Sequence, residues 1–107
     1  MDKSTQIRAM ASVPRLCILR LLAAPEKHFS HQCSADPKAF GVCVTLIAEA
    51  LAVSQPTASR HLDMLRQAGF ISVRKHLKWS YCQRDEAAIS DYLNWLSREI
   101  SAASTGG

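Results

Sequence analysis

The chain has few glycines, no long apolar run and no apolar segment at its start, and each of these absences excludes a class of protein. The four glycines lie at positions 41, 69, 106 and 107, so they cannot form the glycine-rich loop of nucleotide-dependent enzymes. Charged residues interrupt every apolar run before the ~20 residues that a membrane-spanning helix needs. The polar N-terminus has no apolar region typical of a secretory signal. We therefore expect a cytoplasmic protein that does not contact a membrane.

The 107 residues are enough for one domain, and 48% hydrophobic with 21% charged residues is typical of a globular protein. A single domain of this size buries a modest core, which favours an oligomer. In a reducing cytosol the four cysteines are expected to be thiols or metal ligands, and not disulfides.

The net charge of +4 is concentrated in the middle of the chain. Between residues 54 and 84 the single acidic residue is Asp63, and the basic residues are Arg60, Arg66, Arg74, Lys75, Lys78 and Arg84. The segment 85–107 is acidic. This asymmetry predicts one face that meets a polyanion, although a solvated basic surface would give the same pattern.

The spacing of apolar residues predicts a single, mostly α-helical domain at 1–101, with about five helices and a small two-stranded β-hairpin. Proline 25 should end a buried helix that begins after Ser12, and the polar stretch 25–41 should be a long loop. The remaining predicted segments are a helix-turn-helix at about 45–68, a wing at about 71–83, a C-terminal helix at about 85–100 and a disordered tail at 102–107.

Two short helices followed by a basic hairpin predict a winged helix-turn-helix, whose second helix fits the major groove of double-stranded DNA. On that helix Gln55 can pair with adenine and Arg60 with guanine or a phosphate, while short hydroxyl side chains suit phosphates. The predicted DNA-contacting residues are Ser54, Gln55, Thr57, Ser59, Arg60, His61, Arg74, Lys75 and Lys78. For His61, a half-buried structural role is an equal alternative.

The C-terminal helix carries an apolar face wider than one small domain needs to cover, which predicts a homodimer built on the first and last helices. The predicted interface residues are Ile7, Met10, Ile89, Tyr92, Leu93, Trp95, Leu96 and Ile100.

The segments VPRLCILRLL, LIAEALAVSQPTASRHLDMLRQAGFI and RKHLKWSY resemble the ArsR/SmtB family of winged-helix regulators, over about residues 7–100. The resemblance implies a homodimer that represses its own operon by binding an inverted repeat and is released by an inducer, often a metal ion or arsenite. Of the family's Cys-Val-Cys-Asp-Leu-Cys motif only Cys43 remains, and the C-terminal helix has no histidine. The two usual metal sites of the family are therefore not expected.

Cys43 also belongs to another candidate sensor. The other members are His28, His31 and Cys33 in the polar stretch, with Cys33 ten positions before Cys43. Two imidazoles and two thiolates suit a zinc-like ion. Oxidation of Cys33 and Cys43 is the alternative chemistry, and a flexible loop with a structural Cys43 is the third. Cys17 is expected in the core, and Cys82 in the core or at its edge.

The sequence thus predicts a DNA-binding repressor that is released by a metal, a metalloid or thiol oxidation. One alternative is a metal- or thiol-handling protein that uses the same fold for protein contacts, and another is a regulator of this type with no metal site. No enzyme is predicted, because no catalytic pair has a supporting motif.

Overall fold

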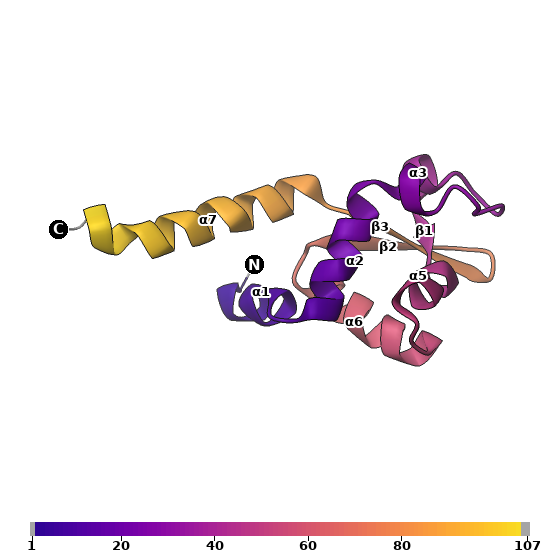
Figure 1. Ribbon diagram of the computed structural model, residues 1–107, viewed down its shortest axis with the longest axis horizontal. Coiled ribbons are helices and arrows are strands. Elements are labelled where there is room, and N and C mark those ends of the chain that lie inside the picture. The colour runs from indigo at the N-terminus through magenta and orange to yellow at the C-terminus, as the bar shows by residue number, and fades with distance from the viewer. Residues whose placement is uncertain (1, 106–107) are drawn as a thin grey trace.

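The computed structural model describes residues 2–105 and is mostly helical (Figure 1). Its elements are α1 (Lys3–Met10), α2 (Val13–Ala23), α3 (Pro25–His28), α4 (Pro37–Phe40), β1 (Val42–Cys43), α5 (Val44–Leu51), α6 (Gln55–Gln67), β2 (Ile71–His76), β3 (Trp79–Arg84) and α7 (Glu86–Thr105). Residues 2–105 therefore contain seven helices where about five are predicted, because two single-turn helices lie in the stretch expected to be a loop.

Side-chain caps begin the principal helices. The Ser12 side chain accepts a hydrogen bond from the backbone of Arg15, and the Ser54 side chain accepts one from Thr57, each at 3.3 Å. Pro14 and Pro56 lie in the first turns, where the absence of a backbone N–H leaves no bond unmade. Both predicted helix starts are thereby confirmed.

The helix-turn-helix consists of α5 and α6. Ala52 ends α5 in the left-handed conformation, with φ 57°, and its backbone N–H donates to carbonyls of the preceding helix. The buried stripe of α6 is Ala58, Leu62 and Leu65, as its spacing predicts. This stripe packs into the same core as Ile18, Leu19 and Leu22 of α2, whereas Leu16 of the same helix is 43% exposed.

The sheet has three antiparallel strands in the order β1–β3–β2, and not only the two strands of the wing. The third strand, β1, pairs Val42 with Cys82 and Cys43 with Tyr81. Gly41 precedes it with φ 111°, and a Cβ there would lie 3.0 Å from the Cys82 carbonyl oxygen. Glycine therefore allows the chain to approach β3 closely at this point.

The polar stretch 25–41 is more ordered than its sequence predicts. Phe29, Gln32 and Pro37 are buried in it, and the Tyr81 hydroxyl donates to Ser34 Oγ at 2.9 Å. These contacts hold the stretch against β1 and β3.

The last helix, α7, leaves the body of the molecule beside α1, and its far end lies well away from α5 and α6 (Figure 1). It continues to Thr105, so residues 102–105 are helical and correct the prediction of a disordered tail. Residues 106–107 lie outside the described residues. No helix within 2–105 is long and apolar enough to cross a membrane.

Candidate nucleic-acid interface

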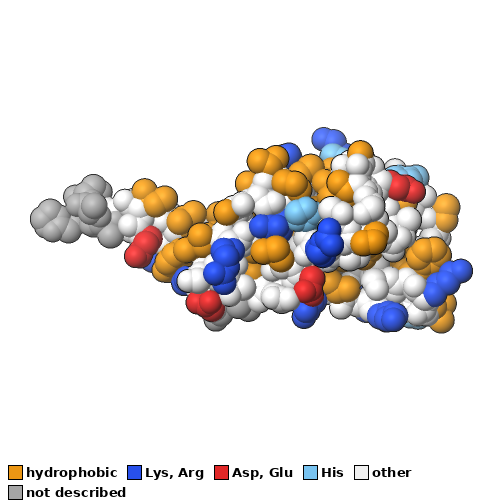
Figure 2. Space-filling model, turned by 90° about the horizontal axis from the view of Figure 1, so that it is seen from below, with side chains coloured by type: hydrophobic (Ala, Val, Ile, Leu, Met, Phe, Trp, Pro, Cys, Tyr) orange, Lys and Arg blue, Asp and Glu red, His pale blue; other side chains and the backbone are white. Residues whose placement is uncertain are grey.

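The exposed face of α6 carries polar and basic side chains from its first turns onward. Gln55, Ser59 and Arg60 are exposed on it, as predicted. The Ser54 hydroxyl donates to Thr57 Oγ1 at 2.9 Å, so these two side chains form the helix cap. The view of the molecule from the α6 side shows Lys and Arg side chains spread over the surface, with acidic ones less frequent (Figure 2).

The single carboxylate of α6 is neutralised on the helix itself. Arg66 Nη2 lies 2.7 Å from Asp63 Oδ1, and Gln67 Nε2 donates to Asp63 Oδ2 at 2.6 Å. The hydrogen bond from Arg66 is the main cause that lowers the pKa of Asp63. The acidic residue therefore does little to reduce the positive potential near Arg60.

The wing lies beside the start of α6. A hollow of about 220 Å³ is shared by the two elements, with Gln55 and Ser59 on one side and Lys78 and Trp79 on the other. Lys75 and Lys78 are exposed, and Lys78 Nζ lies 5.2 Å from the centre of the Trp79 ring. The structure thus brings Gln55 and Ser59 of α6 beside Lys78 of the wing.

Arg74 is held differently from the prediction. Its Nη2 donates to the Phe40 carbonyl at 2.7 Å, and its guanidinium carbon lies 3.8 Å from the centre of the Phe40 ring. Arg74 therefore joins the wing to α4 and does not extend freely from the wing.

His61 lies at the edge of α6 in contact with α2. Arg15 Nη1 is 3.1 Å from His61 Nδ1, and the ring is half-buried. Burial, followed by the charges of Arg15 and Arg60, lowers the pKa of His61. The ring is therefore neutral at neutral pH.

The predicted sensing residues are only partly brought together. Exposed Cys33 and buried Cys43 line one hollow of about 200 Å³, with His31 and Trp79. His28 does not line it. Within residues 2–105 no three His, Cys, Asp or Glu side chains are grouped so that they could hold a metal ion. The structure thus brings His31, Cys33 and Cys43 to one hollow, and the metal role of the four residues stays a prediction.

The buried side chain of Gln32, which no sequence pattern indicates, forms hydrogen bonds with the segments around this hollow. Gln32 Oε1 accepts from the Cys43 backbone N–H at 2.8 Å, and Gln32 Nε2 donates to the carbonyls of Ala35 and Gly41 at 2.8 and 3.0 Å. Gln32 therefore ties the segment beside Cys33 to the start of α5.

The remaining two cysteines differ in their surroundings. Cys82 is fully buried, and burial followed by the neighbouring Cys43 raises the pKa of its thiol to about 12. It is an inert core residue. Cys17, for which a core position is predicted, is instead half-buried.

The predicted dimer face is exposed only in part. Ile7, Leu93 and Ile100 are exposed by 45%, 53% and 72%, and Met10, Trp95 and Leu96 are half-buried against the core. The predicted interface position is wrong for Ile89 and Tyr92. Both are buried in the chain's own core, where the Tyr92 ring lies 5.2 Å from that of Phe70.

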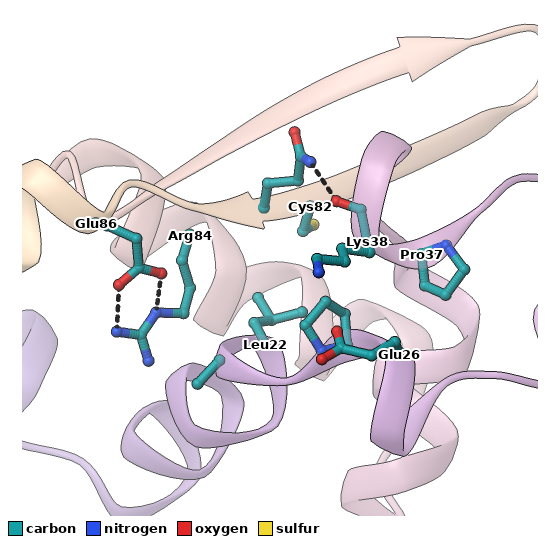
Figure 3. Close-up of a pocket in the computed structure, with 10 residues that line it drawn as sticks. Leu22, Glu26, Pro37, Lys38, Cys82, Arg84 and Glu86 are labelled. Carbon is teal, nitrogen blue, oxygen red and sulfur yellow. Dashed lines mark hydrogen bonds and ion pairs between the residues drawn. The ribbon is translucent and has the colours of Figure 1, made fainter.

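A hollow of about 460 Å³ lies where α2, α3, α4, β3 and α7 meet (Figure 3). Arg84 donates from Nη1 to the Leu19 carbonyl and forms an ion pair with Glu86, both at 2.9 Å. Gln83 donates to the Lys38 carbonyl at 3.3 Å. These polar groups already bind within the protein, so they join the wing to the surrounding helices.

The chain resembles known regulators over nearly its whole length. A family described as bacterial regulatory protein, arsR family, matches residues 42–73. YbzH, an HTH-type transcriptional regulator of Bacillus subtilis, is 36% identical over 100 residues, which cover 94% of this chain and 100% of that protein.

Two solved structures share the fold. A crystallised ArsR family transcriptional regulator has a TM-score of 0.69 at 16% identity, with 94% of this chain and 89% of that one covered. The homodimeric winged helix-turn-helix DNA-binding domain of a possible ArsR-family regulator from Mycobacterium bovis has a TM-score of 0.63 at 22% identity, with 92% and 78% covered. These likenesses confirm the predicted winged helix-turn-helix fold.

Proposed function

The chain belongs to the ArsR family of transcriptional regulators, and on this basis we propose that it is a homodimeric repressor that binds an inverted-repeat operator in double-stranded DNA. The observation that carries the proposal is the convergence of the exposed start of α6 and the basic wing on one side of the molecule. A helix of this kind places its N-terminal side chains against base edges in the major groove.

The two groups of side chains have separate roles in this proposal. Gln55 and Arg60 read base edges, because amide and guanidinium groups match the donor and acceptor patterns of adenine and guanine. Lys75 and Lys78 bind phosphates at the flank of the site, which adds affinity without sequence preference.

The second copy of the chain covers the apolar side chains that α1 and α7 leave exposed. Ile7, Leu93 and Ile100 lie on these two helices, with half-buried Leu96 and Trp95 beside the latter two. A two-fold symmetric dimer presents two α6 helices to the two halves of an inverted repeat.

We test the base-reading role by comparing two arginines on α6. The Arg60 side chain makes no ion pair or hydrogen bond within the described residues, whereas that of Arg66 is paired with Asp63. Arg60→Ala is expected to weaken operator binding by ~1–3 kcal/mol and to relax sequence preference, whereas Arg66→Ala, which exposes the charge of Asp63, should weaken binding to specific and shuffled DNA equally. Equal losses on specific and shuffled DNA for Arg60→Ala would contradict a base contact.

Release by thiol oxidation is the inducer chemistry that the shared hollow of Cys33 and Cys43 favours. Hydrogen peroxide oxidises the exposed Cys33 thiol to a sulfenic acid and is itself reduced to one water. Attack by the Cys43 thiol then forms a disulfide and releases a second water. The disulfide would draw Cys33 across the hollow to Cys43 at the start of α5, which packs on α6.

The cysteine proposal has its own test, a titration of operator DNA before and after peroxide. Wild type should lose affinity and regain it with a reductant. Cys33→Ser and Cys43→Ser should bind DNA and resist peroxide, and Cys17→Ser should behave as wild type. Normal release of Cys43→Ser would show that this pair is not the sensor.

A further inference from the structure

A buried arginine joins three helices behind the recognition helix α6. Arg15 belongs to α2, and its side chain is only 9% exposed. Its Nε donates to the Ala9 carbonyl at 2.8 Å, and its Nη2 donates to the Arg8 carbonyl at 2.9 Å. These are carbonyls of the last turn of α1, and that of Arg8 also accepts from the Ala11 backbone N–H at 3.2 Å. The third nitrogen, Nη1, reaches His61 on α6 at 3.1 Å.

The hydrogen-bonding chemistry of arginine fixes the protonation state and the tautomer of His61. A guanidinium only donates hydrogen bonds and stays protonated in proteins, so Nδ1 of His61 must be the acceptor. An imidazole whose Nδ1 accepts is neutral and carries its proton on Nε2. Nε2 points to the other side of the ring from Arg15, and the ring is partly exposed next to Arg60.

Resting on the proposed DNA-binding function, we propose that Arg15 is a positioning residue for DNA binding. It ties α6 to the carboxyl end of α1 through His61, and it orients the His61 ring so that Nε2–H donates to a phosphate of the DNA.

A second buried side chain ties the carboxyl end of α6 to the same helix. Gln6 of α1 is 4% exposed, and its Nε2 donates to the Ala68 carbonyl at 3.2 Å. His61 and Ala68 are about 10 Å apart along a helix that rises ~1.5 Å per residue. Two such ties fix both the position and the tilt of α6 relative to α1.

These contacts between α1 and α6 also concern the proposed dimer, because α1 carries Ile7 and Met10 of the apolar face. The partner chain would hold α1, and α1 holds α6 through Gln6 and Arg15. The separation of the two recognition helices is then set by this chain of contacts, and an inverted repeat requires one fixed separation.

The charges around the ring make its titration a sensitive readout. Of the described residues, the charged groups that act on His61 are Arg15 on α2 and Arg60 on α6 itself. The groups of α1 that contact the Arg15 side chain are uncharged backbone carbonyl oxygens. Burial is the first cause of the lowered pKa of His61 and the charge of Arg15 is the second, so removal of that charge should raise the pKa.

The test combines ¹⁵N NMR of the histidine ring with operator titrations on the full chain. In wild type we expect a bare Nδ1 and a protonated Nε2 at neutral pH, with the Nε2 proton protected from exchange in the operator complex. Arg15→Gln, which keeps a donor and removes the charge, should raise the pKa of His61 and weaken operator binding about tenfold. His61→Ala should lose a similar factor, and His61→Gln, which keeps an acceptor and a donor, should recover most of it. The matched control is Arg20→Gln, an exposed arginine on the same helix.

Three results would overturn the proposal: a protonated Nδ1 in wild type at neutral pH, an Arg15→Gln variant with unchanged operator affinity and His61 pKa, or an Nε2 proton unprotected by DNA. The ring spectra of wild type decide the Arg15–His61 contact even if the Arg15 variants do not fold. If wild type itself fails to bind DNA from beside its own coding region, the proposed function is wrong, while the ring spectra still report on the contact.

Discussion

The neutral ring of His61 makes the stability of the fold depend on pH. Its pKa in the folded protein lies below the ordinary value of 6.5, because of burial first and then Arg15 and Arg60. Below pH 6.5 the unfolded chain therefore binds the proton more readily than the folded one, and stability falls as pH decreases toward the folded pKa. Urea unfolding should show a smaller loss of stability between pH 7.5 and 5.5 for His61→Gln than for wild type. An unchanged pH dependence in His61→Gln would contradict the argument.

Gly41 is expected to tolerate no side chain. Its φ of 111° disfavours other residues, and a Cβ would lie 3.0 Å from both the Cys82 carbonyl oxygen and Gln83 Cγ. Gly41→Ala should lower the free energy of unfolding by roughly 1–3 kcal/mol, measured by denaturant titration. At Gly69, with φ 83°, only the backbone strain applies, so Gly69→Ala should cost less. A larger loss at Gly69 would show that the close approach at Gly41 is unimportant.

The sequence identifies the exposed side chains of α6 and the wing, but not the buried polar residues that hold these elements. Arg15 lies among apolar residues of α2 and reaches a partner 46 positions away. Gln32 lies in a polar stretch without periodicity, yet its amide is buried. Local patterns carry no information on such long-range contacts, so these two residues became visible only in the structure.

The turn between α5 and α6 carries backbone strain that a single substitution should relieve. Ala52 has φ 57° and is exposed, so its side chain contributes little packing. Glycine adopts this conformation without a steric penalty and is the usual residue after a helix end. Ala52→Gly should raise the free energy of unfolding by about 0.5–1 kcal/mol in denaturant titrations. A lower stability would mean that the entropy of the unfolded chain outweighs the strain.

Elements with strong local signals were predictable, and those that depend on pairing were not. Capping serines and prolines mark the starts of α2 and α6, and alternating apolar residues mark the wing. The two-residue strand β1 exists because of its pairing with β3, and α3 and α4 are single turns. Such short elements have too few residues for a periodic pattern. The sequence carries no clear helix-stop signal before the final glycines, so the predicted helix end at about 100 falls short of the observed end at Thr105.

For the protein as a whole, a charge on the exposed face of α7 should separate the proposed dimer. Leu93 is 53% exposed, so Leu93→Glu should leave the monomer folded while it places a carboxylate in the proposed interface. Sedimentation velocity at micromolar concentration should show a dimer for wild type and a monomer for this variant. Leu77→Glu, 82% exposed in the wing turn, is the matched control and should remain dimeric. A monomeric wild type would contradict the assignment of α1 and α7 to the interface.

The central claim is that two chains together bind one specific DNA site through α6 and the wing. Sedimentation of the reduced protein with a fluorescent duplex from beside its own coding region measures stoichiometry and affinity together. The account predicts two chains on each duplex and an affinity at least ~10³-fold above that for a shuffled duplex at physiological salt. Equal affinity for both duplexes, or one chain on each duplex, would contradict it.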